Sequence, residues 1–534
     1  MATPAPSSRR VSPALGIVFI AAVAALEGSA PNISSTALVS ASRSLNMVGG
    51  TLALAASMQT LAVAATVITT GLLADRLGRR RVLMAALVVA IVGDLVVASA
   101  PTTLFYLLGQ AIMGVGMGAV YGSCFAYIRV LANPKKLAAA VGLFSAVIML
   151  ATLLLTFAGG SLLSIDWRAA FLIEPVLCAA ALVLVPILLP NQERIADPKS
   201  DYLGQAFLGL GIVSFLYGIS ELAHSLTAPT TLVPLAVGLV LLAGFFVRES
   251  RNEQRFFPVS LFRQPVFIAA ILAGLVYNFG SAVVFLQVTN LWQYVNGLQT
   301  MQVAVWQIPM IGAGIVGALA TGRLMSKHGA TNRAALLVGG LMSGSGMVML
   351  ALFHSSTSIW GFLPGLVLAG GGVVVAAVPY GNLILKEAPA AYYGPVTSSR
   401  TTIGQFLYSI GFAVSTVLID KLTIGGTVAK LDAAGVPPQQ VGTGLDAVTA
   451  YAAKSTAPET SLGKAALADA ITSYGDAFAT TMVIVGIICA VGGVAGYVVL
   501  RRHADRAETH PDPLPIPIAT PSTNPEPAGA LHGS

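Results

Sequence analysis

Residues 71–81 read GLLADRLGRRR and lie between two long apolar runs. This stretch contains Gly71 and Gly78, and glycines let the chain reverse direction where a side chain would prevent it. The arginine cluster beside Gly78 is typical of a short loop on the cytoplasmic side of a membrane. The simplest interpretation is a tight turn between two membrane-spanning helices.

The composition of the whole chain is that of a membrane protein. Of its 534 residues, 55% are hydrophobic and 10% are charged, whereas soluble domains contain ~25% charged residues. The mean hydropathy is +0.81 and there are 55 glycines, which suits closely packed transmembrane helices. A membrane β-barrel would instead show short segments of alternating polarity. We therefore predict an all-α polytopic membrane protein.

The apolar runs are long enough to cross a bilayer, because a hydrocarbon core of ~30 Å needs ~20 helical residues. The first run passes Glu27 and ends near Thr36, which is longer than the apolar part of a signal peptide, so we expect a retained helix. Fourteen spans are predicted, at residues 14–36, 51–72, 82–100, 103–131, 137–161, 169–190, 203–223, 231–248, 266–289, 300–322, 333–353, 358–385, 392–419 and 476–500.

The positive charges predict the orientation of these spans. Most of the 29 lysines and arginines fall on the side of Arg9, which is therefore expected to be cytoplasmic together with both termini. Six fall on the opposite side: Arg43, Arg168, Lys421, Lys430, Lys454 and Lys464. The net charge of +7 follows this topology, so we expect a multi-pass protein of the cytoplasmic membrane and no nucleic-acid partner.

The segment 71–81 resembles the signature loop between helices 2 and 3 of the major facilitator superfamily, G-x-L-a-D-r-x-G-r-r. The matching residues are Gly71, Leu73, Asp75, Arg76, Gly78, Arg79 and Arg80. Residues 322–329, GRLMSKHG, repeat the frame of this loop after the tenth span. Residues 167–175, WRAAFLIEP, resemble the entry to helix 6 in a fourteen-helix branch, the drug:proton antiporters, with Glu174 in place of an Asn.

The resemblance implies the major facilitator fold, with two six-helix halves and two inserted central helices. The N-terminal half is expected at 14–190, the inserted helices with their linkers at 191–265, and the C-terminal half at 266–500. Residues 1–13 and 501–534 are expected as cytoplasmic tails, the second disordered, and residues 420–475 as a long extracytoplasmic loop. In the family, the acid of the signature loop meets the start of helix 13, so we predict that Asp75 contacts the region of Gly394.

Glu27 is the best candidate for a proton-binding residue. An acidic side chain within a membrane helix costs about 2.5 to 3.5 kcal/mol on insertion scales and so usually has a function. The branch has an Asp at the matching place in helix 1. A hydrated acid near the outer mouth, without a role in transport, is the alternative interpretation.

Two motifs depart from the antiporter pattern. The buried Arg of helix 4, which is thought to assist proton transfer in the family, is Gln110 here. Residues 155–160, LTFAGG, retain the trailing glycines of the antiporter signature in helix 5 but lack its Gly-Pro pair. These departures leave open an uncoupled or differently coupled carrier for another solute, and a membrane sensor that does not transport.

Further polar residues are expected at membrane depth. A substrate cavity between the halves is predicted to contain Tyr121, Asn278, Arg400, Gln405 and Tyr408. Each of them is as well suited to a hydrogen bond with a neighbouring helix. The acids Asp94 and Glu221 lie near predicted helix ends, so solvation is the simpler interpretation for both.

The sequence predicts a secondary transporter and not an enzyme. It offers no nucleophile, base and orienting group at a plausible spacing. The three cysteines, Cys124, Cys178 and Cys489, each lie inside an apolar run and are expected to pack, so neither a metal site nor another cofactor is predicted. The expected function is proton-coupled efflux of amphipathic or cationic small molecules by a monomer in the lipid bilayer.

Overall fold

The computed structural model describes residues 12–47, 50–163, 165–191, 201–222, 225–252, 256–327, 331–355, 358–454 and 458–509. The tail 1–11, most of the linker at 192–200 and residues 510–534 lie outside this part of the chain. The helices are α1 (Pro13–Ser44), α2 (Gly50–Leu77), α3 (Arg79–Ala98), α4 (Thr103–Leu131), η1 (Pro134–Lys136), α5 (Leu137–Leu162), α6 (Trp167–Ala170), α7 (Ile173–Leu188), α8 (Tyr202–Glu221), α9 (Pro229–Arg251), η2 (Val259–Arg263), α10 (Pro265–Gly274), η3 (Leu275–Phe279), α11 (Gly280–Tyr294), α12 (Thr300–Lys327), α13 (Asn332–Leu352), η4 (Ile359–Phe362), α14 (Leu363–Glu387), η5 (Ala390–Tyr392), α15 (Tyr393–Ala433), α16 (Pro438–Lys454) and α17 (Ser461–Thr509).

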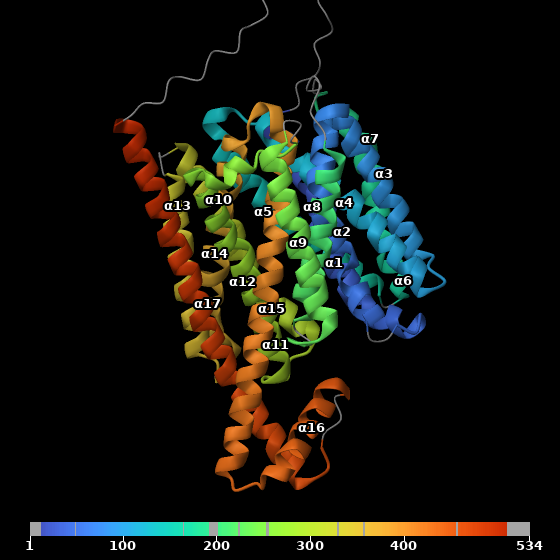
Figure 1. Cartoon of the computed structure of the whole chain (residues 1–534), viewed down its shortest axis with the longest axis vertical. Helices are drawn as coiled ribbons and strands as arrows, with labels where there is room; N and C mark the ends of the chain where they lie inside the picture. The colour runs from blue at the N-terminus through green and yellow to red at the C-terminus, as the bar shows by residue number, and fades with distance from the viewer. Residues whose placement is uncertain are drawn as a thin grey trace, which may run out of the picture.

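The described residues contain fourteen helices that are long and apolar enough to cross a membrane, which confirms the predicted number. They form two six-helix halves, with α1 to α7 in one and α10 to α17 in the other, and α8 and α9 between them (Figure 1). Short helices merge into single spans: α6 precedes α7, and the π-helical turn η3 joins α10 to α11. Helices account for all regular secondary structure in the described residues.

The turn at residues 71–81 is tighter than a loop. Helix α2 runs to Leu77 and α3 begins at Arg79, so Gly78 alone separates them. Gly78 has a φ of 95°, a conformation that side chains with a Cβ rarely adopt. The glycine is therefore what allows two spans to be joined by one residue.

Glycines also set the spacing of the helices within the N-terminal half. Gly114, Gly118 and Gly122 lie along one face of α4 and pack against α2, where a Cβ on Gly114 would meet the backbone oxygen of Gln59 at 2.5 Å. Small residues at four-residue spacing form a smooth helix face, which lets the two backbones approach closely.

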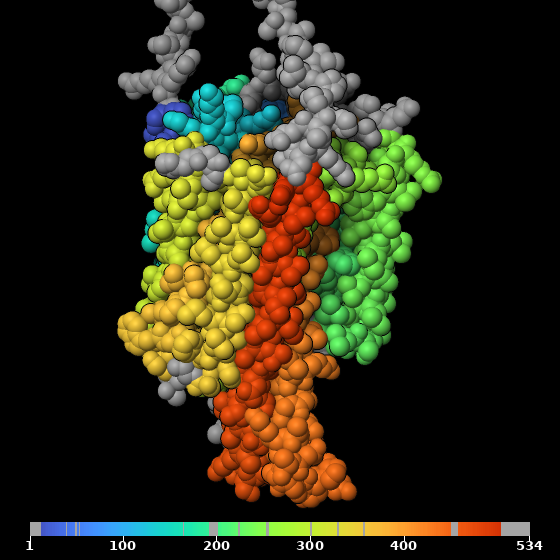
Figure 2. All heavy atoms as spheres, turned by 90° about the vertical axis from the view of Figure 1, so that its left-hand side faces the viewer, coloured from blue at the N-terminus to red at the C-terminus, as the bar shows by residue number. Residues whose placement is uncertain are grey.

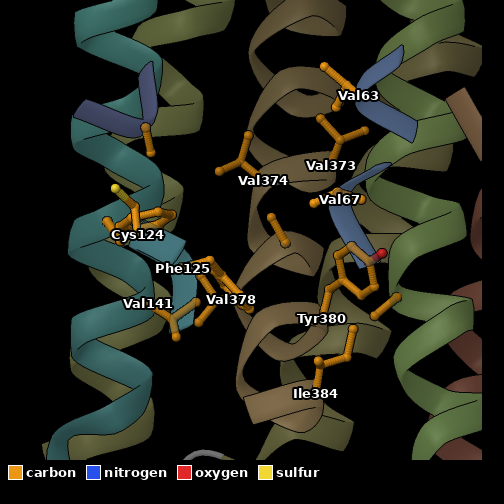
Figure 3. Close-up of a cluster of buried hydrophobic side chains, with 14 of the residues drawn as sticks. Val63, Val67, Cys124, Phe125, Val141, Val373, Val374, Val378, Tyr380 and Ile384 are labelled. Atoms are coloured by element: carbon orange, nitrogen blue, oxygen red, sulfur yellow. The ribbon is translucent and has the colours of Figure 1, made fainter. Parts of the chain in front are cut away.

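An apolar cluster fills the region between the halves (Figure 3). In this view the buried side chains of α14 lie in the middle, those of α4 and α5 lie to their left, and those of α2 lie to their right. The labelled members are Val63, Val67, Cys124, Phe125, Val141, Val373, Val374, Val378, Tyr380 and Ile384.

The segment 420–475 differs from the expected loop, because most of it is helical. Helix α15 continues to Ala433, α16 follows, and α17 begins at Ser461, so that the segment projects beyond the bundle (Figures 1 and 2). A small core of its own holds it together, around Leu431, Val441 and Ala466. The polar composition of this segment therefore indicates where the chain leaves the apolar bundle. It does not indicate where the helices end.

The inserted helices are fixed to both halves. Helix α8 packs against α2 and α15, and the rings of Phe215 and Phe406 stack with their centres 5.5 Å apart.

Where α8 begins, the Asp201 carboxylate accepts hydrogen bonds from Arg248 Nε at 2.5 Å, from Asn252 at 2.9 Å and from the Gly204 N–H at 3.0 Å. Burial alone would raise the pKa of Asp201, but these hydrogen bonds and the charge of Arg248 hold it below its ordinary value.

Candidate functional site

The predicted contact between Asp75 and the start of α15 is present. The Asp75 carboxylate accepts the Gly394 N–H at 2.5 Å and a hydrogen bond from Arg79 at 2.5 Å. The Arg79 guanidinium lies 4.4 Å from the centre of the Tyr393 ring. Because the first N–H groups of a helix lack partners within it, a carboxylate there both satisfies a donor and complements the helix dipole. Asp75 thus ties the two halves together at one end of the bundle, called here the Asp75 end.

The other residues of the signature loop surround this contact. Gly71 packs directly against the Gly394 backbone and the Ser398 hydroxyl, so there is no room for a side chain. Arg76 and Arg80 are partly exposed beside it, and Arg80 interacts electrostatically with Tyr127 of α4.

More contacts join the halves near the same end. Arg129 donates hydrogen bonds to the carbonyl oxygens of Leu385 and Ala388, each at 3.2 Å. The Ala139 N–H donates to the Ser326 hydroxyl at 3.0 Å, where α5 meets α12. These bonds, together with that of Asp75, lie where the loops rich in arginine and lysine emerge.

Glu27 and Arg400 lie further into the bundle and come from opposite halves. Glu27 is 9% exposed and Arg400 is 6% exposed. The two side chains interact electrostatically, α1 supplying the acid and α15 the base. A buried acid and a buried base stabilise each other in a low dielectric, and removing either charge leaves the other uncompensated.

Aromatic side chains enclose the Arg400 guanidinium. Arg400 donates a hydrogen bond to the Tyr121 hydroxyl, and its guanidinium lies 4.6 Å from the Phe125 ring centre and 4.9 Å from that of Tyr380. Tyr277 of η3 also interacts with Arg400 electrostatically. The Nε of Arg400 is buried and has no hydrogen-bond partner among the described residues. The Arg400 cation is thus surrounded by aromatic rings. Its N–H at Nε remains without an acceptor among the described residues.

The remaining predicted cavity residues stand at different distances from this centre. Asn278 packs against Gly404 of α15 and donates to the Gly274 carbonyl oxygen at 3.0 Å, a bond within its own span and not the bond to a neighbouring helix given as the alternative. Gln405 is half-buried on the following residue of α15. Tyr408 is 42% exposed and interacts electrostatically with Tyr277.

Gln110 belongs to a separate polar network. Its amide donates to the Ser34 hydroxyl at 3.2 Å, and Ser34 also lies 3.4 Å from the Gln59 amide oxygen. Ser34 lies seven residues after Glu27 on α1, which places this network about two helical turns from the acid.

Comparison with known proteins agrees with this architecture. The family model described as Major Facilitator Superfamily matches residues 17–412. The chain belongs to the major facilitator superfamily.

Individual members of the superfamily are related to the chain over most of its length. It is 27% identical to a multidrug resistance protein B homolog of Mycobacterium tuberculosis (strain CDC 1551 / Oshkosh) over 67% of both chains. It is 26% identical to the tetracenomycin C resistance and export protein of Streptomyces glaucescens over 86% of both chains. The crystal structure of the human organic anion transporter MFSD10 (TETRAN) shares the fold, with a TM-score of 0.56 and 14% identity over 91% of this chain and 100% of that one.

In the N-terminal half of this major facilitator protein, sequence reasoning missed the burial of Asp94 and Glu174. Asp94 is 0% exposed, so the expectation that it is solvated near a helix end is wrong. Asp94 lies on the face of α3 that packs against α4 and α7, not on its outer face. Glu174, noted only as a departure from the branch motif, is 2% exposed. The one signal in the sequence was that Glu174 replaces the Asn of the motif at the entry to helix 6.

A pocket of about 270 Å³ lies at the Asp75 end, away from Arg400. It is lined by η1 and the beginning of α5 from one half, and by α12, α13 and α14 from the other. None of the predicted cavity residues takes part in its lining.

Proposed function

We propose that this chain exports amphipathic or cationic small molecules in exchange for protons. The observation behind the proposal is the burial of an acid and a base from opposite halves, Glu27 and Arg400, which interact electrostatically without forming an ion pair within 4 Å among the described residues. Transport by alternating access requires the halves to separate at one end and meet at the other. A proton on Glu27 removes its charge and weakens its attraction to Arg400, so protonation and the arrangement of the halves are linked.

The names of related proteins support the drug class of substrate. One is named for multidrug resistance and another for tetracenomycin C resistance and export. The aromatic side chains around Arg400 suit a large planar or amphipathic solute, and Glu27 suits a cation when Arg400 is drawn away from it. One charge crossing 100 mV is worth ~2.3 kcal/mol, enough for a roughly 50-fold gradient.

The proposed orientation places the Asp75 end and both termini in the cytoplasm. The arginines of the signature loop support it through the positive-inside rule. In this orientation the bond between Asp75 and Gly394 is a latch that closes the protein to the cytoplasm. We take the monomer as the working unit, because each half contributes one member of the Glu27–Arg400 pair.

Substituting Glu27→Gln tests the proposal. Purified protein in liposomes with an imposed pH gradient should accumulate a fluorescent lipophilic cation or tetracenomycin C, and substrate addition should release protons. The variant should lose the uphill gradient, from roughly 50-fold to none, and lose the proton release. Glu221→Gln, at the end of α8, is the matched control and should transport as the wild type does.

A carrier without coupling is the second candidate function, because Gln110 cannot titrate and the Gly-Pro pair is missing. It would move solute downhill in the same liposomes with no change in pH. Uphill export that persists unchanged in Glu27→Gln would contradict the assignment of the proton site.

A further inference from the structure

Asp94 and Glu174 form a buried pair of acids inside the N-terminal half. Asp94 comes from α3 and Glu174 from α7, and the two carboxyl groups interact electrostatically. Neither takes part in an ion pair with a lysine, arginine or histidine among the described residues. Glu27 forms no such ion pair either among the described residues, but the charge of Arg400 acts on it, whereas no cation acts in this way on Asp94 or Glu174.

The hydrogen bonds of the pair are incomplete. The Ser29 hydroxyl donates to Glu174 Oε1 at 3.0 Å. Both oxygens of Asp94 are buried without a hydrogen-bond partner in the described part of the chain. Buried polar groups are nearly always hydrogen-bonded, and an ionised carboxylate needs donors most of all. Burying the charge of an Asp94 carboxylate without donors is costly, and a proton bound to Asp94 removes that charge.

The surroundings of the pair support this assignment. Two carboxylates close together in a low dielectric cannot both be ionised, so such a pair keeps at least one proton where single acids would lose theirs. The other titratable groups that interact with it are Glu27 of α1 and Cys178 of α7. Where α3 packs against α4, Gly93 meets the backbone of Met113, and no charged group of α4 interacts with Asp94 among the described residues.

We propose that Asp94 and Glu174 are a second proton-binding site, which titrates as one unit with Glu27. The inference rests on the proposed proton coupling and extends it beyond the cavity. Glu27 and Glu174 interact, so a negative charge on one increases the affinity of the other for its proton. The number of protons exchanged in a transport cycle is then set by three carboxyl groups and not by Glu27 alone.

Infrared difference spectroscopy of the full-length protein in lipid tests the site directly. A pH step from acid to alkaline should remove a band of protonated carboxyl groups, and Asp94→Asn and Glu174→Gln should each delete part of it. In Glu27→Gln, the part assigned to the pair should titrate at a pH lower by about one unit. Glu221→Gln, the same chemical change at a partly exposed helix end, should leave that part unchanged.

Two results would overturn the site. One is a band of the pair that persists at alkaline pH, which means a permanently protonated structural pair. The other is a band that both variants leave intact. If the variants fail to fold, Asp94→Glu and Glu174→Asp, which keep each carboxyl group, should shift the band of the pair in place of deleting it. The titration needs no substrate, so it separates failure of this site from failure of proton-coupled export.

Discussion

At the scale of single residues, Asp75 shows how one carboxylate can connect distant parts of the chain. It is 3% exposed, accepts the Gly394 N–H and is paired with Arg79. These partners belong to the next helix in sequence and to a helix more than three hundred residues later. The residue that identifies the loop is therefore also the residue that closes the Asp75 end.

Replacing Asp75 by Ala should favour the state in which the Asp75 end is open. The change leaves Arg79 without its counter-charge and the Gly394 N–H without its acceptor, and breaking a buried pair costs about 3 to 5 kcal/mol in the closed state. Spin labels on the exposed ends of α2 and α15 should report longer distances. Asp75→Asn retains an acceptor and should have a smaller effect. Equal distances in Asp75→Ala and the wild type would contradict the latch.

Asp201 gives a prediction about pH. Its pKa is held below the ordinary value, so its contribution to stability is present above pH ~5 and is lost as the pH falls through the folded-state pKa. We expect Asp201→Asn to be less stable by about 1 to 2 kcal/mol at neutral pH and to approach the wild type as the pH falls through the folded-state pKa of Asp201. The stability of both proteins can be followed at each pH with a thiol-reactive dye, which labels the buried cysteines when heating exposes them.

The matched control for Asp201 is Asp166→Asn. Asp166 also precedes a helix, but its side chain is 52% exposed and its nearest cation, Arg168, is 4.0 Å away. Its substitution should change stability little at any pH. A difference in stability between Asp201→Asn and the wild type that stays constant from neutral pH down to the pH of acid unfolding would refute the proposed role of the charge.

At the scale of helices, glycines decide where the two halves can meet. Gly71 of α2 faces Gly394 of α15, and Gly142 of α5 faces the Ala318 carbonyl oxygen of α12. In both places a backbone occupies the position that a Cβ would need. The contact surfaces at the Asp75 end are thus fitted to residues without side chains.

Gly71→Ala should weaken the closed state and slow export. A methyl group there overlaps the Gly394 backbone, which cannot move as a flexible side chain would, and overpacking typically costs about 1 to 3 kcal/mol. That corresponds to a roughly 5- to 150-fold change in the balance of states. Gly312→Ala in α12 is the control, because nothing lies within 4 Å of its added Cβ. Export by both variants at equal rates would contradict the close approach.

The number and type of the helices could be predicted from the sequence, because each span has to bury its backbone polar groups in an apolar run of fixed length. The extension at 420–475 could not, since a helix outside the bilayer needs no such run. Hydrophobic patterning also failed for Asp94, whose burial depends on which face of α3 meets α7. The contact of Asp75 was predictable only through the family resemblance.

At the scale of the whole molecule, the hydrogen bonds between the halves lie from the middle of the bundle to the Asp75 end. Thr402 donates to the Ala64 carbonyl oxygen at 3.3 Å near the middle, and Arg129 and Ala139 make their bonds nearer the end. An alternating cycle must break these bonds together, because they all join the same two rigid halves. The state described here is accordingly the one closed at the Asp75 end.

A cross-link at this end should therefore stop transport. Ala139 of α5 and Ser326 of α12 are joined by a backbone-to-hydroxyl hydrogen bond of 3.0 Å, so cysteines at both positions lie close enough to form a disulfide on oxidation. The double variant Ala139→Cys/Ser326→Cys should lose at least about tenfold of its export rate when oxidised, the loss expected if the open state is disfavoured by ~1.4 kcal/mol or more. A reductant should restore the rate. Each single variant is a control, and the native cysteines are buried and do not compete. Undiminished export by the cross-linked protein would mean that the halves do not separate at the Asp75 end during transport.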